Sequence, residues 1–154
     1  MFGTMKRGVN AYANVGLETG VASASPHKLI VMLYDGVLTA LAKAKANIAG
    51  GNVPAKGAAI SHAITIIDNG LRVSLDMSAG GEVAENLNQL YEYMSRRLFE
   101  ANIKNDVVIV EEVHGLLSTL REAWVTIGDK VEQGQAVPAP LQAPAARVMN
   151  LAGA

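Results

Sequence analysis

Apolar residues recur every three or four positions along four separate stretches of this chain, and this spacing constrains the fold more than any other feature. On an α-helix the spacing places the apolar side chains on one face, which must then be buried. Helices are therefore expected over residues 26–49, 53–79, 82–104 and 107–127. The links between them are short, and short links make neighbouring helices pack side by side. The pattern predicts an all-α fold, an antiparallel up-down four-helix bundle.

The residues at the ends of these stretches are ones that start or stop helices. The Ser25 hydroxyl can accept a hydrogen bond from a free backbone N–H of the first helical turn. Pro26 suits the first helical position because proline has no backbone N–H, and an N–H at that position would have no partner within the helix. Asp106 is a plausible N-cap of the last helix. The predicted stops are glycines, which readily take the left-handed conformation that follows a helix: Gly50-Gly51, Gly80-Gly81 and Gly128. Glu82 is expected to open the third helix.

The length of 154 residues suits one hydrophobic core and is short for two. We expect the bundle domain to cover residues 25–130. Residues 1–24 contain too many glycines for a full helix and are interpreted as a short N-terminal cap segment. Residues 131–154 are rich in Ala, Pro and Gln and nearly free of charge, which predicts a flexible, disordered tail.

Composition excludes several classes of protein. The formal net charge is −1 and no more than two Lys or Arg are adjacent, so the basic surface of a nucleic-acid binder is missing. The longest strongly apolar run, Leu29 to Tyr34, is far below the roughly 20 residues that cross a bilayer, so no membrane insertion is expected. There is no cysteine and no recognisable signal peptide. A cytoplasmic location is the expectation.

No constellation of residues predicts catalysis, a cofactor or a metal site. The three histidines fall on different predicted elements, without a Ser, Cys or second His at triad or ligand spacing. Glu111 and His114 have the E-x-x-H spacing of di-iron bundle proteins, but that site needs a second such motif and two further glutamates. His62 cannot supply the second motif, because the residue three positions before it, at position 59, is Ala and not Glu. We therefore expect a protein that is not an enzyme.

The predicted helices carry more apolar side chains than one buried face requires. On the first helix the core stripe is expected to contain Leu29, Leu33, Gly36, Ala40, Ala44 and Ile48. Ile30, Val31, Tyr34, Val37, Leu38 and Leu41 are then surplus, as are Ile66 and Val73 beside the stripe of the second helix. Two explanations remain open. In the first, the surplus covers a homodimer interface or the angles between helices; in the second, it forms grooves that receive amphipathic helices of a partner.

Four blocks in this order resemble the flagellar secretion chaperone family FliS. They are ASPHKLIVMLYDG at 24–36, AITIIDNGL at 63–71, Gly80-Gly81-Glu82 followed by LYEYM at 90–94 and RRL at 96–98, and the segment from Leu116-Leu117 to Ala123-Trp124. The resemblance covers roughly residues 9–128. It implies a helical bundle that binds the disordered C-terminal segment of flagellin, prevents its premature polymerisation and assists its delivery to the flagellar type III export apparatus.

The resemblance also implies roles for particular residues. Val9 and Tyr12 fall where the N-terminal segment of the family covers part of the binding surface and contributes to contacts with the export gate. The predicted flagellin-binding residues are Val9, Tyr12, Ile30, Tyr34, Leu38, Ile66 and Val73. For Tyr34, Tyr91 and Tyr93 the alternative is a phenol at the bundle edge with its hydroxyl in water. A regulatory protein is a further candidate partner.

Overall fold

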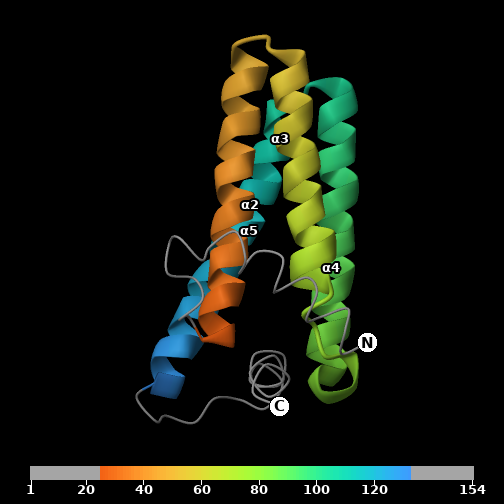
Figure 1. Ribbon diagram of the computed structural model, residues 1–154. Helices are drawn as coiled ribbons and strands as arrows, with labels where there is room; N and C mark the ends of the chain where they lie inside the picture. The colour runs from red at the N-terminus through yellow and green to blue at the C-terminus, as the bar shows by residue number, and fades with distance from the viewer. Residues whose placement is uncertain (1–24, 133–154) are drawn as a thin grey trace.

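The computed structural model describes residues 25–132 and arranges them as a bundle of helices (Figure 1). The elements are α2 (Pro26–Ala49), α3 (Val53–Ile66), the π-helix η3 (Ile67–Arg72), α4 (Met77–Lys104) and α5 (Val107–Glu132). Successive helices run in opposite directions along a common axis. The predicted antiparallel up-down four-helix bundle is therefore confirmed. The predicted cap segment and nearly all of the predicted tail lie outside the described residues.

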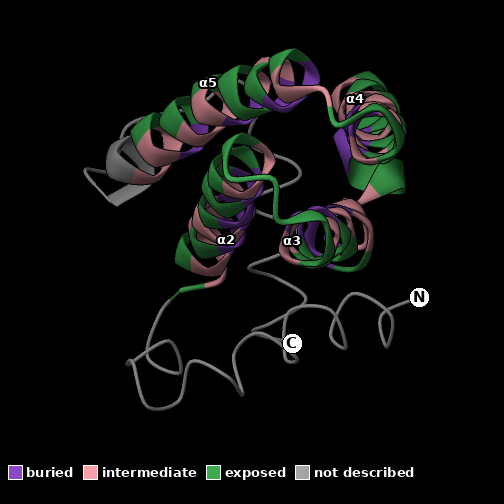
Figure 2. Ribbon diagram, turned by 90° about the horizontal axis from the view of Figure 1, so that it is seen from above, coloured by how far each residue is buried: buried purple, intermediate pink, exposed green. Residues whose placement is uncertain are grey.

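The four α-helices occupy the corners of a quadrilateral when the bundle is viewed from above (Figure 2). α2 packs against both α3 and α5, and α4 packs against the same two helices. Each helix thus has two neighbours, and the buried side chains of all four meet in one core.

Most helix starts lie where the cap residues predict them. The Ser25 hydroxyl accepts a hydrogen bond from the Lys28 amide at 3.1 Å, with proline in the first turn of α2. The Asp106 carboxylate accepts one from the Val108 amide at 2.9 Å at the start of α5. These side chains satisfy donors that the first helical turn leaves without a partner, which fixes where each helix begins.

The boundary between the second and third helices differs from the prediction. α3 passes into the π-helical turn of η3, which ends at Arg72, and α4 begins at Met77 instead of Glu82. The cause is Asp76, whose carboxylate accepts the amides of Ser78 and Ala79 at 3.1 and 2.9 Å and so caps an extra turn. Gly81 then breaks the helix locally, with φ of 54° and ψ of −130°.

The last helix does not end at Gly128 but continues to Glu132. Gly128 is needed for close packing, because a Cβ atom at this position would lie 2.5 Å from atoms of the His27 ring. The same ring lies against Trp124, with its Nε2 hydrogen-bonded to the Trp124 carbonyl. Glycine here lets α5 approach the start of α2, so it was wrongly interpreted as a helix stop.

The core stripe of α2 also differs from the prediction. Ile30, Val37 and Leu41, which the sequence analysis placed among the surplus residues, are at most 3% exposed. Gly36, which it placed in the stripe, is only partly buried. Because α2 packs against both α3 and α5, its buried arc is wider than one stripe. Much of the apolar surplus is therefore core.

Tyr34 and Tyr91, two of the three tyrosines within residues 25–132, are buried at the centre of the bundle. Tyr34 and Tyr91 are 0% and 1% exposed, and their hydroxyl groups are hydrogen-bonded to each other. The expectation of a phenol at the bundle edge is wrong for both, because each hydroxyl finds its partner on the facing helix. Burial raises the pKa of both phenols. Tyr93 does lie at the edge, where its hydroxyl donates to Glu112 at 2.5 Å.

Candidate functional site

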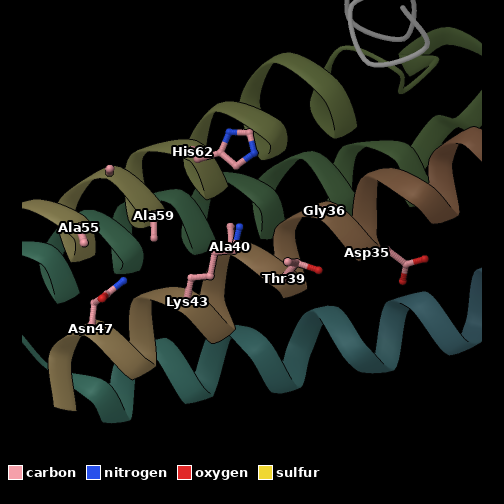
Figure 3. Close-up of a pocket in the computed structure, with 10 residues that line it drawn as sticks. Asp35, Gly36, Thr39, Ala40, Lys43, Asn47, Ala55, Ala59 and His62 are labelled. Atoms are coloured by element: carbon pink, nitrogen blue, oxygen red, sulfur yellow. The ribbon is translucent and has the colours of Figure 1, made fainter. Parts of the chain in front are cut away.

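A groove of about 600 Å³ runs along the outer side of the bundle between α2 and α3 (Figure 3). Its lining residues come from these two helices only. They are Asp35, Gly36, Thr39, Ala40, Lys43 and Asn47 on α2, and Ala55, Ala58, Ala59 and His62 on α3. The two sets lie along the antiparallel helices over about three helical turns.

The floor of the groove consists of small residues. Ala40 is 2% exposed and Ala59 is partly buried, while Gly36 contributes no side chain. A Cβ atom at Gly36 would lie 3.3 Å from Cδ1 of Ile66, so the two helices are packed tightly beneath the groove. Small side chains at these positions give the furrow its depth, because larger ones would fill it.

Polar side chains border the floor. Thr39, Lys43 and Asn47 follow one another along the α2 wall, and His62 lies on the α3 wall (Figure 3). At one end the Asp35 carboxylate accepts a hydrogen bond from the Arg121 guanidinium on α5, which compensates its negative charge. Lys43 thus leaves the groove weakly positive.

This arrangement is suited to binding a helix. An apolar floor with polar borders matches the way an amphipathic helix inserts its apolar face and leaves its polar face in water. Within residues 25–132, no cluster of three His, Asp or Glu side chains could hold a metal ion. Glu111, of the E-x-x-H pair, instead forms an ion pair with Lys45 at 2.7 Å.

The seven predicted flagellin-binding residues are not brought together in this groove. Val9 and Tyr12 lie outside the described residues. Ile30, Tyr34 and Ile66 are buried in the core, and Leu38 and Val73 are partly exposed. None of these five lines the groove. Their contact with flagellin stays a prediction.

The residues that do line the groove were not predicted as binding residues. The available signal was the recurrence of small residues on facing helices, at Gly36 and Ala40 on α2 and at Ala55 and Ala59 on α3. Both pairs have a spacing of four, which places small side chains one turn apart on the same face. Gly36 and Ala40 were assigned to the core stripe because a small apolar residue also suits a tightly packed interior.

Comparison with known proteins places this bundle in a family. The family model described as flagellar protein FliS matches residues 8–131. The chain belongs to the FliS family of flagellar secretion chaperones. It is 54% identical to the flagellar secretion chaperone FliS of Salmonella typhimurium over 123 residues, which cover 80% of this chain and 91% of that protein. The resemblance found in the sequence is thereby confirmed.

Two further relatives agree with the assignment. The chain is 49% identical to the flagellar secretion chaperone FliS of Escherichia coli over 118 residues, covering 77% of this chain and 87% of that protein. It is 43% identical to FliSB of Pseudomonas aeruginosa over 118 residues, covering 77% and 93%. A FliS protein is a chaperone and not an enzyme. Within the described part of the chain, no helix is long and apolar enough to cross a membrane.

Proposed function

We propose that this FliS protein binds the disordered C-terminal segment of flagellin in the cytoplasm, prevents its premature polymerisation and assists its delivery to the flagellar type III export apparatus. The α2–α3 groove is the proposed docking site for one helix of that segment. The observation that carries the proposal is a helix-sized groove with a small-residue floor in a member of a secretion-chaperone family.

The dimensions of the groove set the size of the client helix. Gly36 and Asn47 lie eleven residues apart on α2, which corresponds to about 17 Å at the helical rise of 1.5 Å per residue. A client helix of about three turns therefore fits along it. Large apolar side chains spaced three or four residues apart on the client would contact the alanine floor.

The polar borders suit a client that folds as it binds. Thr39, Asn47 and His62 can hydrogen-bond the polar side chains or the free terminal carbonyls of a newly formed helix. Lys43 favours a helix whose C-terminal end lies beside it, because that end carries partial negative charge. Coupled folding and binding keeps the free client unfolded, as passage through a narrow export channel requires.

The other predicted contact residues fit into this proposal in different ways. Leu38 and Val73 are partly exposed and can contact a client segment that continues beyond the groove. Ile66 supports the groove from below, since it packs beneath Gly36. Val9 and Tyr12 are proposed to take part in covering the site and in contact with the export gate.

Calorimetric titration of the full chain with a flagellin C-terminal peptide of about 40 residues tests the proposal. We expect saturable one-to-one binding with a large negative heat-capacity change, because folding of the peptide buries apolar surface. No heat and no complex from a well-folded protein would refute client binding. Sedimentation would then show whether a homodimer uses the groove instead.

A further inference from the structure

A second apolar surface lies at one end of the bundle, away from the α2–α3 groove. Among the described residues, the most exposed large apolar side chains are Val53, Phe99, Ile103 and Val108, with 57, 61, 66 and 68% of their surface accessible. They belong to the start of α3, the last turns of α4 and the start of α5, which meet at the same end of the bundle (Figure 1). We call these four residues the end patch.

Phe99 and Ile103 are the centre of the end patch. They are four residues apart, so they lie one turn above each other on the outward face of α4. The core-facing residues of this part of α4 are Met94, Leu98 and Ala101, which are completely buried. Phe99 and Ile103 therefore contribute little to the core, and helix formation does not require apolar residues there.

The neighbouring part of α3 has a glycine close to this end of α4. Gly57 on α3 carries no side chain, and a Cβ atom there would meet only Oδ1 of Asn102, at 3.8 Å. An added Cβ atom there would be in ordinary van der Waals contact with α4, so the two helices lie close together at this point.

A buried lysine adds positive charge beneath the end patch. Lys56 is 4% exposed, and its ammonium donates to the Asn102 carbonyl at 2.7 Å and to Oδ1 of Asn105 at 2.6 Å. Both acceptors are uncharged. The interaction closes the C-terminal end of α4, whose partial negative charge offsets only part of the charge of the lysine.

The surface charges on this part of α4 also leave an excess of positive charge. Arg97 and Lys104 are compensated by Glu100 and Glu112, at 2.8 to 2.9 Å. Arg96, one turn before Phe99 and Glu100, is exposed, and among the described residues no carboxylate forms an ion pair with it. A partner at the end patch is therefore favoured if it carries carboxylates beside its apolar residues.

We propose that the end patch is a second docking surface, which binds an amphipathic helix with an acidic flank from a partner protein other than flagellin. Apolar anchors of the partner at i and i+3 or i+4 contact Phe99 and Ile103, and its Asp or Glu side chains pair with Arg96. The groove is lined by α2 and α3 only, so a client helix bound in it leaves Phe99 and Ile103 on α4 uncovered. The proposal goes beyond client binding.

The size of the end patch favours a short helix over a second copy of this chain. Four side chains with this exposure offer an apolar area on the order of 400 Å². A standard stable interface buries about 800 Å² on each partner. A two- or three-turn helix needs only the smaller area, since a few anchors supply most of its affinity.

Photo-crosslinking in the flagellated cell tests the proposal. The full chain carries benzoylphenylalanine in place of Val108, at the border of the end patch, or in place of Gln89 as an exposed control on α4. We expect one dominant adduct from position 108 and none from position 89. Mass spectrometry should place the cross-linked peptide in an amphipathic segment with an excess of Asp and Glu.

Two variants decide whether the adduct reports this surface. Phe99→Ser with Ile103→Ser should reduce the adduct at least tenfold while the helicity of the protein is retained, because both side chains are exposed. Ala59→Leu, in the floor of the groove, should leave the adduct unchanged even though the client is lost. An adduct with flagellin, with a second copy, with residues 133–154 of this chain or with a basic segment would overturn the proposal, and so would the absence of an adduct.

Discussion

Filling the floor of the α2–α3 groove should abolish most of the client affinity without affecting the fold. Ala59→Leu adds three carbon atoms at the middle of the α3 wall, where the groove is lined by Ala55 and His62 on either side. A client helix would have to move outward or give up the apolar anchor that contacts this position. Burial of one large apolar side chain contributes about 1.5–3 kcal/mol. The expected loss is therefore roughly a 10- to 150-fold increase in Kd.

The substitution should leave the stability of the free protein nearly unchanged. Ala59 is partly exposed, so the larger side chain can extend into the groove without displacing core residues. Leucine and alanine have similar helix propensities, and we expect a change in the free energy of unfolding below about 0.5 kcal/mol. Calorimetric titration with the flagellin peptide measures Kd, and urea unfolding followed by circular dichroism measures stability.

A matched control separates the groove from a general effect of added apolar surface. Ala46→Leu makes the same change at an exposed position of α2 that does not line the groove. This variant should bind the peptide with the affinity of the wild type. The reasoning is refuted if Ala59→Leu binds normally, or if both variants lose affinity to the same extent while remaining folded.

Two further predictions concern stability. Gly128→Ala should destabilise the protein by about 1 kcal/mol, because the overlap with His27 costs about 1–3 kcal/mol and exceeds the roughly 1 kcal/mol that alanine gains in a helix. In a His27→Ala background the same change should instead be stabilising by up to about 1 kcal/mol, and a stability cycle in urea that shows no change of sign would contradict this. Hydrogen bonds, first from Tyr93 and then from Arg97, lower the pKa of Glu112 in the folded protein. The ionised carboxylate therefore stabilises the fold at pH values above its unfolded pKa of about 4.3. This stabilisation is lost as the pH falls through the lower pKa of the folded state. The Tm difference between wild type and Glu112→Gln should therefore shrink from pH 6 to pH 3, and a constant difference across that range would argue against the hydrogen bonds.

Features set by local interactions could be predicted from the sequence. Ser25 and Asp106 were identified as caps because a side-chain oxygen needs only the two or three following amides to act. The all-α class followed from periodicity alone. The π-helical turn at 67–72 and the extra turn capped by Asp76 were not found, because their residues also fit a regular helix followed by a glycine stop.

Features set by contacts between distant residues could not be predicted. Nothing near Gly128 in the sequence shows that the His27 ring lies against it, so the glycine was interpreted by its backbone freedom alone. The same applies to Tyr34 and Tyr91, whose hydroxyl groups satisfy each other across the core. The groove was missed because an alanine on one helix gives no information about which helix faces it.

The distribution of apolar residues explains why the two proposed surfaces differ in chemistry. The wide buried arc of α2 takes up large side chains such as Ile30 and Leu41, which the sequence had left available for binding. The floor of a binding site on the same side of the bundle must then be made from small residues, Gly and Ala, so the fit of a helix there depends mainly on shape, and the polar borders add hydrogen bonds and the charge of Lys43. At the end patch, Phe99 and Ile103 project from the surface near Arg96, which forms no ion pair within residues 25–132. That surface selects a partner by charge as well as by apolar contact, so a single helix is not expected to bind both sites equally well.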